Sequence, residues 1–382
     1  MLRAMTRISF LAMLLCFLSL GLCAQNRFTD EGLDHAAKPL GLKYKLVDLG
    51  TLGVNTVIGY GLNNKGDATG AAWALVGCSD EETFLYTNKS KMINMGFAGC
   101  NFGMSINDSG QIAFNQDHHT GSGDYTAHRH TPMVGDIDLG TLPGDIGSYA
   151  IHINAFGDVV GGSVTNDPPQ WLLGDPFLYT DQNGMLDLGS LGGGRGQANG
   201  INTNGTVVGW SRTSSTPVGD YWDPGDAFVW TPDIGIVDLN TLSKTPGWNL
   251  RSAAAVNGKG IIVGYGMNKK VKLIQAFFYN PATQTVRNLG TFPKGGFSYA
   301  LDINSKGWVV GAAYLDASGI GNYRAAVWPN GNPGALNLNN LILGGTGGWI
   351  LAEARAINAA GQILAWGVDN NGHTHAFRLD PK

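Results

Sequence analysis

The chain has 382 residues, of which 14% are charged and 43% hydrophobic, and it contains 57 glycines. This composition is typical of a folded all-β protein with many turns and excludes an intrinsically disordered chain. The formal charge of −4 becomes −6 (23 basic minus 29 acidic residues) once the first 24 residues are removed, which argues against a nucleic acid as partner.

The first 24 residues have the features of a signal peptide. Arg3 and Arg7 supply a positive start, residues 8–22 form an uncharged apolar run, and Ala24 is a small residue at a cleavage position. The run is too short to favour a membrane span, and no second long apolar run follows. We therefore predict a secreted, extracellular protein. Periplasmic or cell-surface retention stays open, as does the alternative of a lipid on Cys23.

Residues 25–43 are interpreted as an N-terminal linker and residues 44–382 as one repeat domain. A short phrase occurs seven times: an aliphatic residue, Asn, two variable residues and Gly. Its asparagines are Asn63, Asn107, Asn154, Asn202, Asn257, Asn304 and Asn358. Asn and Gly in this order favour a hairpin turn. The repeat length matches the roughly 40–50 residues of a four-stranded propeller blade.

A second hairpin follows each Asn hairpin. Its first arm is aromatic, as in Phe177-Leu178-Tyr179, and its second arm reads like Leu186-Asp187-Leu188-Gly189. Each repeat is therefore predicted to be a four-stranded antiparallel meander. The residue four before each Asn is always small, which suggests crowding of the inner strands around a central axis. These seven residues are Gly59, Gly103, Ala150, Ala198, Ala253, Ala300 and Ala354.

The phase of the repeats predicts how the chain ends meet. The domain begins with a fourth-strand phrase, Val47-Asp48-Leu49, and ends with a third-strand phrase, Ala376-Phe377. If the first strand joins the last repeat, the ring closes without an open sheet edge. The sequence thus predicts an all-β, seven-bladed β-propeller with one-plus-three closure.

The repeats resemble those of the HAF-repeat family of bacterial extracellular proteins. Asp187-Leu188-Gly189-Ser190-Leu191-Gly192-Gly193 is a close copy of one family phrase, and His375-Ala376-Phe377 is the His-Ala-Phe itself. The place of the His is taken in other repeats by Asp175, Asp226, Gln275 or Arg324. The resemblance covers about residues 45–380 and implies an extracellular location and a propeller-like fold, with no established activity or catalytic residues.

Two cysteines remain after removal of the signal peptide. Cys78 and Cys100 flank the first repeat, and the predicted meander places both on one rim of the propeller. In an oxidising compartment a disulfide between them is expected. Two free buried thiols are the alternative.

Candidate binding residues lie first in the long loops between the second and third strands. Trp171, Tyr221 and Trp222 stand there beside Asp residues. Such aromatic rings could stack on sugars while the polar groups bind hydroxyls. Packing of the loops onto the rim is the alternative.

A second candidate set starts each innermost strand and is expected at the mouth of the central channel. The set is Tyr149, Gln197, Tyr299 and Glu353, with Arg355 two positions deeper and Arg195 from a Gly-rich stretch. Water-filled channel lining is the alternative interpretation.

Signals for a metal or a cofactor are weak. His118, His119, His128 and His130 form the only histidine cluster, and no spacing of Cys or carboxylate supports a metal site there. Sequence motifs for nucleotide binding or for a serine or zinc hydrolase are absent. We expect no cofactor and no resident metal.

The favoured hypothesis is a monomeric, non-enzymatic binding or scaffold module that recognises a glycan or a cell-surface protein through the long-loop rim. A hydrolase or lyase of extracellular polysaccharide, with its site near Glu353, is the first alternative, because paired carboxylates meet in space rather than in sequence. A structural envelope protein is the second.

Overall fold

The structure is a computed structural model. It describes residues 41–73, 81–97, 100–117, 125–165, 174–214, 225–319 and 321–382. Within these ranges the chain is almost entirely β-strand. None of its helices is long and apolar enough to cross a membrane, as far as the described residues go.

The strands form four-stranded antiparallel meanders, called units below. The first strands are β2 (Thr56–Leu62), β6 (Cys100–Ile106), β10 (Gly147–Ile153), β14 (Gly192–Ile201), β18 (Trp248–Val256), β22 (Ser298–Ile303) and β26 (Ile350–Ile357). The second strands are β3 (Ala68–Trp73), β7 (Ile112–Asp117), β11 (Val159–Val164), β15 (Val207–Thr213), β19 (Ile262–Asn268), β23 (Val309–Tyr314) and β27 (Ile363–Val368). The third strands are β4 (Glu82–Thr87), β8 (Tyr125–Thr131), β12 (Gly174–Thr180), β16 (Asp226–Thr231), β20 (Leu273–Asn280), β24 (Tyr323–Trp328) and β28 (Thr374–Pro381).

The fourth strands are shorter and lie on the outside: β5 (Lys91–Asn94), β9 (Gly135–Asp138), β13 (Gly184–Asp187), β17 (Gly235–Asp238), β21 (Thr285–Asn288) and β25 (Leu336–Asn337). In the last unit β1 (Tyr44–Asp48) pairs with β28 in the corresponding place. The described residues also include three short helical turns outside the strands: α2 (Leu239–Leu242), η2 (Pro329–Gly331) and η3 (Leu338–Leu341).

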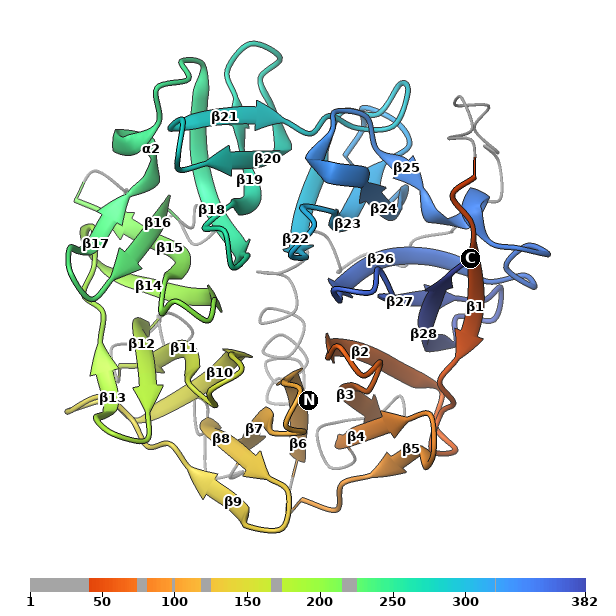
Figure 1. Ribbon diagram of the computed structural model, residues 1–382, viewed down its shortest axis with the longest axis horizontal. Coiled ribbons are helices and arrows are strands. Elements are labelled where there is room, and N and C mark those ends of the chain that lie inside the picture. Colours follow the sequence, from red (N-terminus) through yellow and green to blue (C-terminus); the bar gives the residue numbers. More distant parts are fainter. Residues whose placement is uncertain are drawn as a thin grey trace, which may run out of the picture.

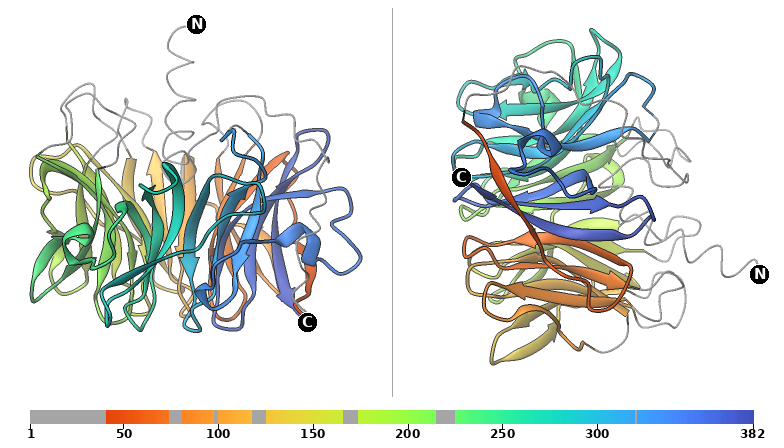
Figure 2. Two further views of the ribbon diagram at one scale, coloured as in Figure 1. Left: turned by 90° about the horizontal axis from the view of Figure 1, so that it is seen from above. Right: turned by 90° about the vertical axis from the view of Figure 1, so that its right-hand side faces the viewer.

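The units are arranged radially around an axis (Figure 1), with the first strands innermost and the strands running along that axis (Figure 2). This is the arrangement of a β-propeller, so the prediction of an all-β propeller fold is confirmed. The core consists of apolar clusters between neighbouring units. The Phe of the aromatic arm lies in this core in five units, as Phe84, Phe177, Phe228, Phe277 and Phe377, each 1% exposed or less. Burying a Phe side chain contributes about 1.5–3 kcal/mol.

Each repeated Asn organises its own hairpin turn. In the turn after β18, Asn257 Oδ1 accepts hydrogen bonds from the N–H groups of Lys259 and Ile261, at 3.0 and 3.1 Å. Gly260 closes the turn at φ +75°, which an L side chain rarely adopts. Backbone N–H groups in the turn have no partner on a neighbouring strand, and the Asn side chain accepts their hydrogen bonds instead, as the sequence indicated.

The same Asn side chains also connect the units. Nδ2 of each donates to the backbone carbonyl of the corresponding Asn in the following unit, and Asn358 donates to Asn63, where the series began. The six other bonds are Asn63 to Asn107, Asn107 to Asn154, Asn154 to Asn202, Asn202 to Asn257, Asn257 to Asn304 and Asn304 to Asn358, at 3.0–3.4 Å. One amide side chain thus fixes both a turn and its neighbour.

The Asp or Asn that ends each fourth strand has a local role. Asp48 Oδ1 accepts the N–H of Gly50 at 2.9 Å, and Asp138 and Asp187 bind Gly140 and Gly189 in the same way. These bonds begin the connection to the next unit. They support the structural interpretation of this repeated acidic residue.

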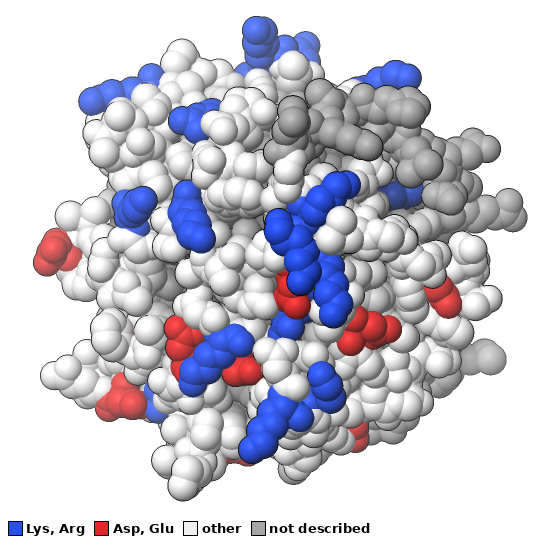
Figure 3. All heavy atoms as spheres, turned by 45° about the vertical axis from the view of Figure 1, so that its right-hand side comes forward, with Lys and Arg blue, Asp and Glu red and all other residues white. Residues whose placement is uncertain are grey.

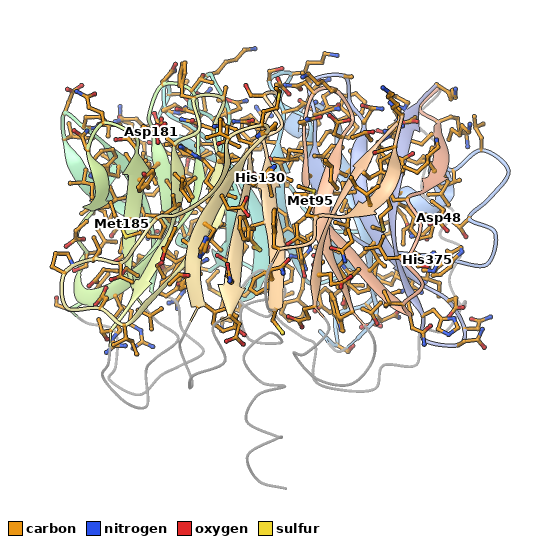
Figure 4. The ribbon with its side chains drawn as sticks, turned by 90° about the horizontal axis from the view of Figure 1, so that it is seen from below. Asp48, Met95, His130, Asp181, Met185 and His375 are labelled. Atoms are coloured by element: carbon orange, nitrogen blue, oxygen red, sulfur yellow. The ribbon has the colours of Figure 1, made fainter. Side chains whose placement is uncertain are left out.

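Several contacts join the two ends of the domain. β1 pairs with β28 over five residues, from Tyr44 opposite Pro381 to Asp48 opposite Phe377. His375 Nδ1 lies 2.9 Å from Asp48 Oδ2, and the two side chains are next to each other in Figure 4. Arg378 Nη1 donates to the Gly66 carbonyl in the first unit at 2.7 Å. An equivalent bond joins Arg129, on β8, to the Gly157 carbonyl in the following unit, also at 2.7 Å.

We predict that Asn257→Ala lowers the free energy of unfolding by about 2–4 kcal/mol. The substitution leaves the partly buried N–H groups of Lys259 and Ile261 without their side-chain acceptor and removes one of the two hydrogen bonds to the Asn304 carbonyl. Each unpaired group costs about 1–3 kcal/mol, or less where water reaches it. Chemical denaturation of the mature chain measures the change. Lys259→Ala in the same turn is the matched control and should change the value by less than about 0.5 kcal/mol. Equal effects of the two substitutions would contradict the role given to Asn257.

Candidate binding site at the axis

A β-bulge brings side chains of every first strand to the axis. The pairing with the second strand shifts by one residue directly after the repeated small residue, as between Ala150 and His152 or between Ala354 and Ala356. The same shift occurs in β2, β6, β14, β18 and β22. A bulge adds one residue to a strand and reorients its side chain. The side chain of the bulged residue therefore does not follow the regular alternation between the two faces of the sheet.

The repeated small residues face the preceding unit and not the axis. A Cβ on Gly59 would lie 2.9 Å from Leu364 Cδ1, and one on Gly103 would collide with Thr69 Oγ1. The predicted crowding is therefore present, but its partner is the second strand of the neighbouring unit. The second strand β11 carries Gly161 for a similar steric reason, because a Cβ at this position would collide with the Tyr149 carbonyl oxygen.

A cavity of about 130 Å³ lies at the level of the bulges. Residues from all seven first strands line it, and the polar ones are Tyr60, Ser105, His152, Asn199, Asp302 and Arg355. The rest of the lining is apolar or glycine. A small cavity with few converging polar groups is the usual form of a ligand site.

Glu353 and Arg355, both predicted from the sequence, form a buried ion pair beside this cavity. The Arg355 Nε contacts Glu353 Oε1, and the two residues are 9% and 2% exposed. The guanidinium also lies over the ring of Tyr60, 5.2 Å from its centroid. Burial raises the pKa of Glu353, while the charge of Arg355 acts in the opposite direction.

Tyr149 and Gln197 belong to a chain of buried hydrogen bonds around the axis. Tyr149 Oη donates to Gln197 Oε1 at 3.0 Å, and Gln197 Nε2 donates to Asn199 Oδ1 at 2.6 Å. Asn199 Nδ2 then donates to Ser252 Oγ and to the Ala253 carbonyl, at 3.2 and 2.9 Å. The chain links three consecutive units with their polar groups satisfied, so it rigidifies this side of the site.

Tyr299 lies in a cluster of tyrosines. Its ring centroid is 5.2 Å from that of Tyr265 and 6.2 Å from that of Tyr314, and Tyr314 contacts Tyr323 at 5.5 Å. Burial raises the pKa of Tyr299 and raises that of Tyr314 to about 12. These phenols therefore stay protonated, and their rings supply apolar surface beside the axis.

Asp302 and His152 were missed by the sequence analysis. Asp302 accepts the N–H groups of Ile303 and Ile357 at 2.7 and 2.8 Å, and Ile201 directs its N–H at His152 Nδ1 from 3.5 Å. Both side chains serve backbone groups near the bulges. Burial raises the pKa of Asp302 to about 6 and lowers that of His152 to about 4. His152 is therefore neutral at physiological pH.

Arg195 is not among the residues that line the cavity. It lies on β14, its carbonyl oxygen accepts a hydrogen bond from Ser211, and its charge is close enough to Asp175 to affect that carboxyl. Burial and the charges of Asp187 and Asp145 raise the pKa of Asp175 to about 6, against the influence of Arg195.

The two described histidines of the predicted cluster have protein partners. His128 stacks on Phe114 at 5.1 Å between centroids and bonds to Thr126, while His130 bonds to Asp136 at 2.5 Å. In the part of the chain that the structure describes, no group of three His, Cys, Asp or Glu side chains is placed to hold a metal.

Other predicted residues lie outside the described ranges. These are Trp171, Tyr221, Trp222, His118, His119 and Cys78. Cys100 is buried at the start of β6. The disulfide stays a prediction.

Glu81 is a third residue that the sequence analysis missed. It directly precedes β4 and is only 4% exposed, and no described residue donates a hydrogen bond to its Oε2. Burial, with a smaller effect from Asp117, raises its pKa to about 7. Its charge is also felt by Tyr60 at the axis. Burial of a single carboxyl has no sequence signature.

The surface drawn in Figure 3 carries both basic and acidic side chains, several of them next to one another. A stripe of one sign, which polyanion-binding proteins use, does not extend across this face.

Comparison with known proteins adds the fold but no function. The family described as "Protein of unknown function (DUF3466)" matches residues 194–375. None of the curated proteins matches this chain. Among solved structures it is similar to the β-propeller domain of the Trilobed protease from Pyrococcus furiosus, described as having an open velcro topology (11% identity, TM-score 0.53, 86% of this chain and 95% of that one).

Two further structures share the fold. One is oligogalacturonate lyase in complex with manganese (9% identity, TM-score 0.55, 90% of this chain and 97% of that one). The other is puromycin hydrolase (11% identity, TM-score 0.56, 86% of this chain). This chain spans 52% of the puromycin hydrolase chain. These similarities establish a β-propeller like those of peptidases and lyases.

We predict that Glu81 makes the protein less stable as pH rises. Its folded pKa of about 7 exceeds the ordinary 4.5, so the folded state binds the proton more tightly. Stability is therefore fully present below the lower value and falls as pH rises through the higher one, by up to about 3 kcal/mol. Glu81→Gln cannot ionise and should unfold at higher denaturant concentration than wild type at pH 8.

Denaturation of both proteins at pH 5 and pH 8 measures this difference. Glu82→Gln, at the exposed neighbouring residue, is the control and should keep the wild-type pH dependence. An unchanged pH dependence in Glu81→Gln would show that this carboxyl is not the cause.

Proposed function

We propose that this chain is a secreted, seven-bladed β-propeller of the HAF-repeat type that acts as a non-enzymatic binding or scaffold module. Its partner is a glycan or a cell-surface protein, bound at the rim where the second and third strands are connected. The observation that carries the proposal is the set of polar groups held at the axis, on a frame locked by the repeated asparagines.

The ring itself is part of the proposal. The pairing of β1 with β28, the bond from Asn358 to Asn63 and the bond from Arg378 to Gly66 support closure by the first strand. Tyr44 and Leu49 on that segment are 0% and 2% exposed. Closure would leave no unpaired strand edge between the first and last units.

We expect that deletion of residues 25–52 destabilises the fold by at least about 4 kcal/mol, because two buried side chains of about 2 kcal/mol each and the β1–β28 pairing are lost. Deletion of residues 25–40, which leaves β1 intact, is the matched control and should melt like the parent. If both deletions melt alike, closure by the first strand is wrong.

Burial at the axis indicates how a partner would bind. Tyr149, Gln197 and Glu353 are each 3% exposed or less, so they shape and stiffen the site and leave the first contacts to the rim. Rigid frames that carry variable loops are common binding scaffolds. Trp171 and Trp222 are the predicted contact residues.

A thermal-shift screen of residues 25–382 against soluble polysaccharides and oligosaccharides tests the proposal. A ligand at about 100 times its Kd stabilises the folded state by about 2.7 kcal/mol. We expect one sugar class to raise the melting temperature saturably, and Trp171→Ala or Trp222→Ala to weaken binding by about tenfold. Phe156→Ala, at an exposed turn on the opposite rim, is the control. If every sugar leaves the melting temperature unchanged, a glycan is not the ligand.

One observation favours the enzymatic alternative, a polysaccharide hydrolase or lyase. Glu353 is a buried carboxyl with a raised pKa, the property that a general acid needs. Incubation of the binding polysaccharide with wild type and Glu353→Gln separates the two functions. Product that forms with wild type and disappears with Glu353→Gln would establish catalysis, whereas a binding module releases none.

A further inference from the structure

The guanidinium of Arg355 has hydrogen-bond donors that the protein does not use. Its Nε faces Glu353, and its plane lies over Tyr60. Neither terminal nitrogen, Nη1 or Nη2, forms a hydrogen bond with any residue in the described part of the chain, although only 9% of the residue is exposed. Unlike Nε, the two terminal nitrogens are not fully buried, so they are accessible at the cavity that Arg355 lines and can donate there to a bound oxygen atom.

The position of Arg355 indicates where the missing partner would lie. Its side chain lines the axial cavity of about 130 Å³, together with Ser105 and Asn199. A cavity of this size exceeds what one water molecule needs and is near the roughly 150 Å³ of an engineered cavity that holds benzene. A ligand of up to about six non-hydrogen atoms would fit.

We propose that the axial cavity binds a small monocarboxylate, whose two oxygens accept hydrogen bonds from the terminal nitrogens of Arg355. The planar fork of Arg matches a carboxylate in a bidentate manner. Glu353 keeps its contact with Nε, so both carboxylates share one guanidinium from different sides. The methyl or hydroxymethyl part of the ligand would lie against the apolar lining, and Ser105 would serve a hydroxyl group.

The acidic groups near the cavity select the charge of the ligand. Glu353 contacts Arg355, and Asp302 lines the same cavity. These carboxylates repel a doubly charged anion such as sulfate about twice as strongly as a monoanion, so they favour a ligand with a single charge. His152 is neutral and adds no positive charge.

Isothermal titration of residues 25–382 with sodium acetate and sodium lactate tests the site, with sodium sulfate and sodium chloride at matched ionic strength. We expect saturable binding of the carboxylates only. Arg355→Lys, which keeps the charge and loses the fork, should weaken binding about tenfold or more. Ala255→Leu, which fills the cavity from another strand, should abolish it.

Two measurements keep the test decisive if Arg355→Lys does not fold. Ala255→Leu leaves the ion pair intact, and the ¹⁵N signals of the Arg355 terminal nitrogens should shift on addition of acetate to wild type. Absence of saturable binding, unchanged affinity in Ala255→Leu, or sulfate binding as tightly as acetate would each overturn the proposal. Polysaccharides are too large for this cavity, so failure of the glycan screen leaves the inference untouched.

Discussion

The structure depends on the side chain of the repeated Asn, which forms hydrogen bonds both within its own turn and to the next unit. Hydrophobic contact between two sheets is non-directional and allows one sheet to slide over the next. A hydrogen bond from Nδ2 of one Asn to the backbone of the next fixes the relative height of two units, as between Asn257 and Asn304. The other end of the amide holds its own turn. Asp lacks the donor and Ser is too short, so only an amide serves both ends.

Local chemistry made much of the fold predictable. The Asn turns, the Asp that caps the next connection and the aromatic third strands each act within about five residues, so they leave a readable pattern. The bonds between units join residues 44 to 55 positions apart, and the last joins residues 295 apart. Nothing in the sequence separates a donor used locally from one used across a unit boundary. The second role of the asparagines was therefore missed.

The axial site was predictable only in part. Position in the repeat selected Glu353 and Arg355, and the structure brings them together. The small residues were placed at the axis, but the β-bulge turns the next residues there instead, and a bulge breaks the alternation on which the alignment relied. Asp302 and His152 follow the bulge where other repeats carry Gly, Ala or Ser. That departure from the repeat was the available signal.

Symmetry places function where the repeat is broken. A position that is the same in every unit can hold neighbouring units together but cannot distinguish one side of a ligand from another. Among the seven residues that match Glu353, and among the seven that match Arg355, only these two carry a charge. Their burial costs more desolvation than apolar residues would, and such pairs are often neutral or unfavourable for stability. The other described units pack without such a pair, so its position beside the axial cavity is consistent with the recognition role proposed above.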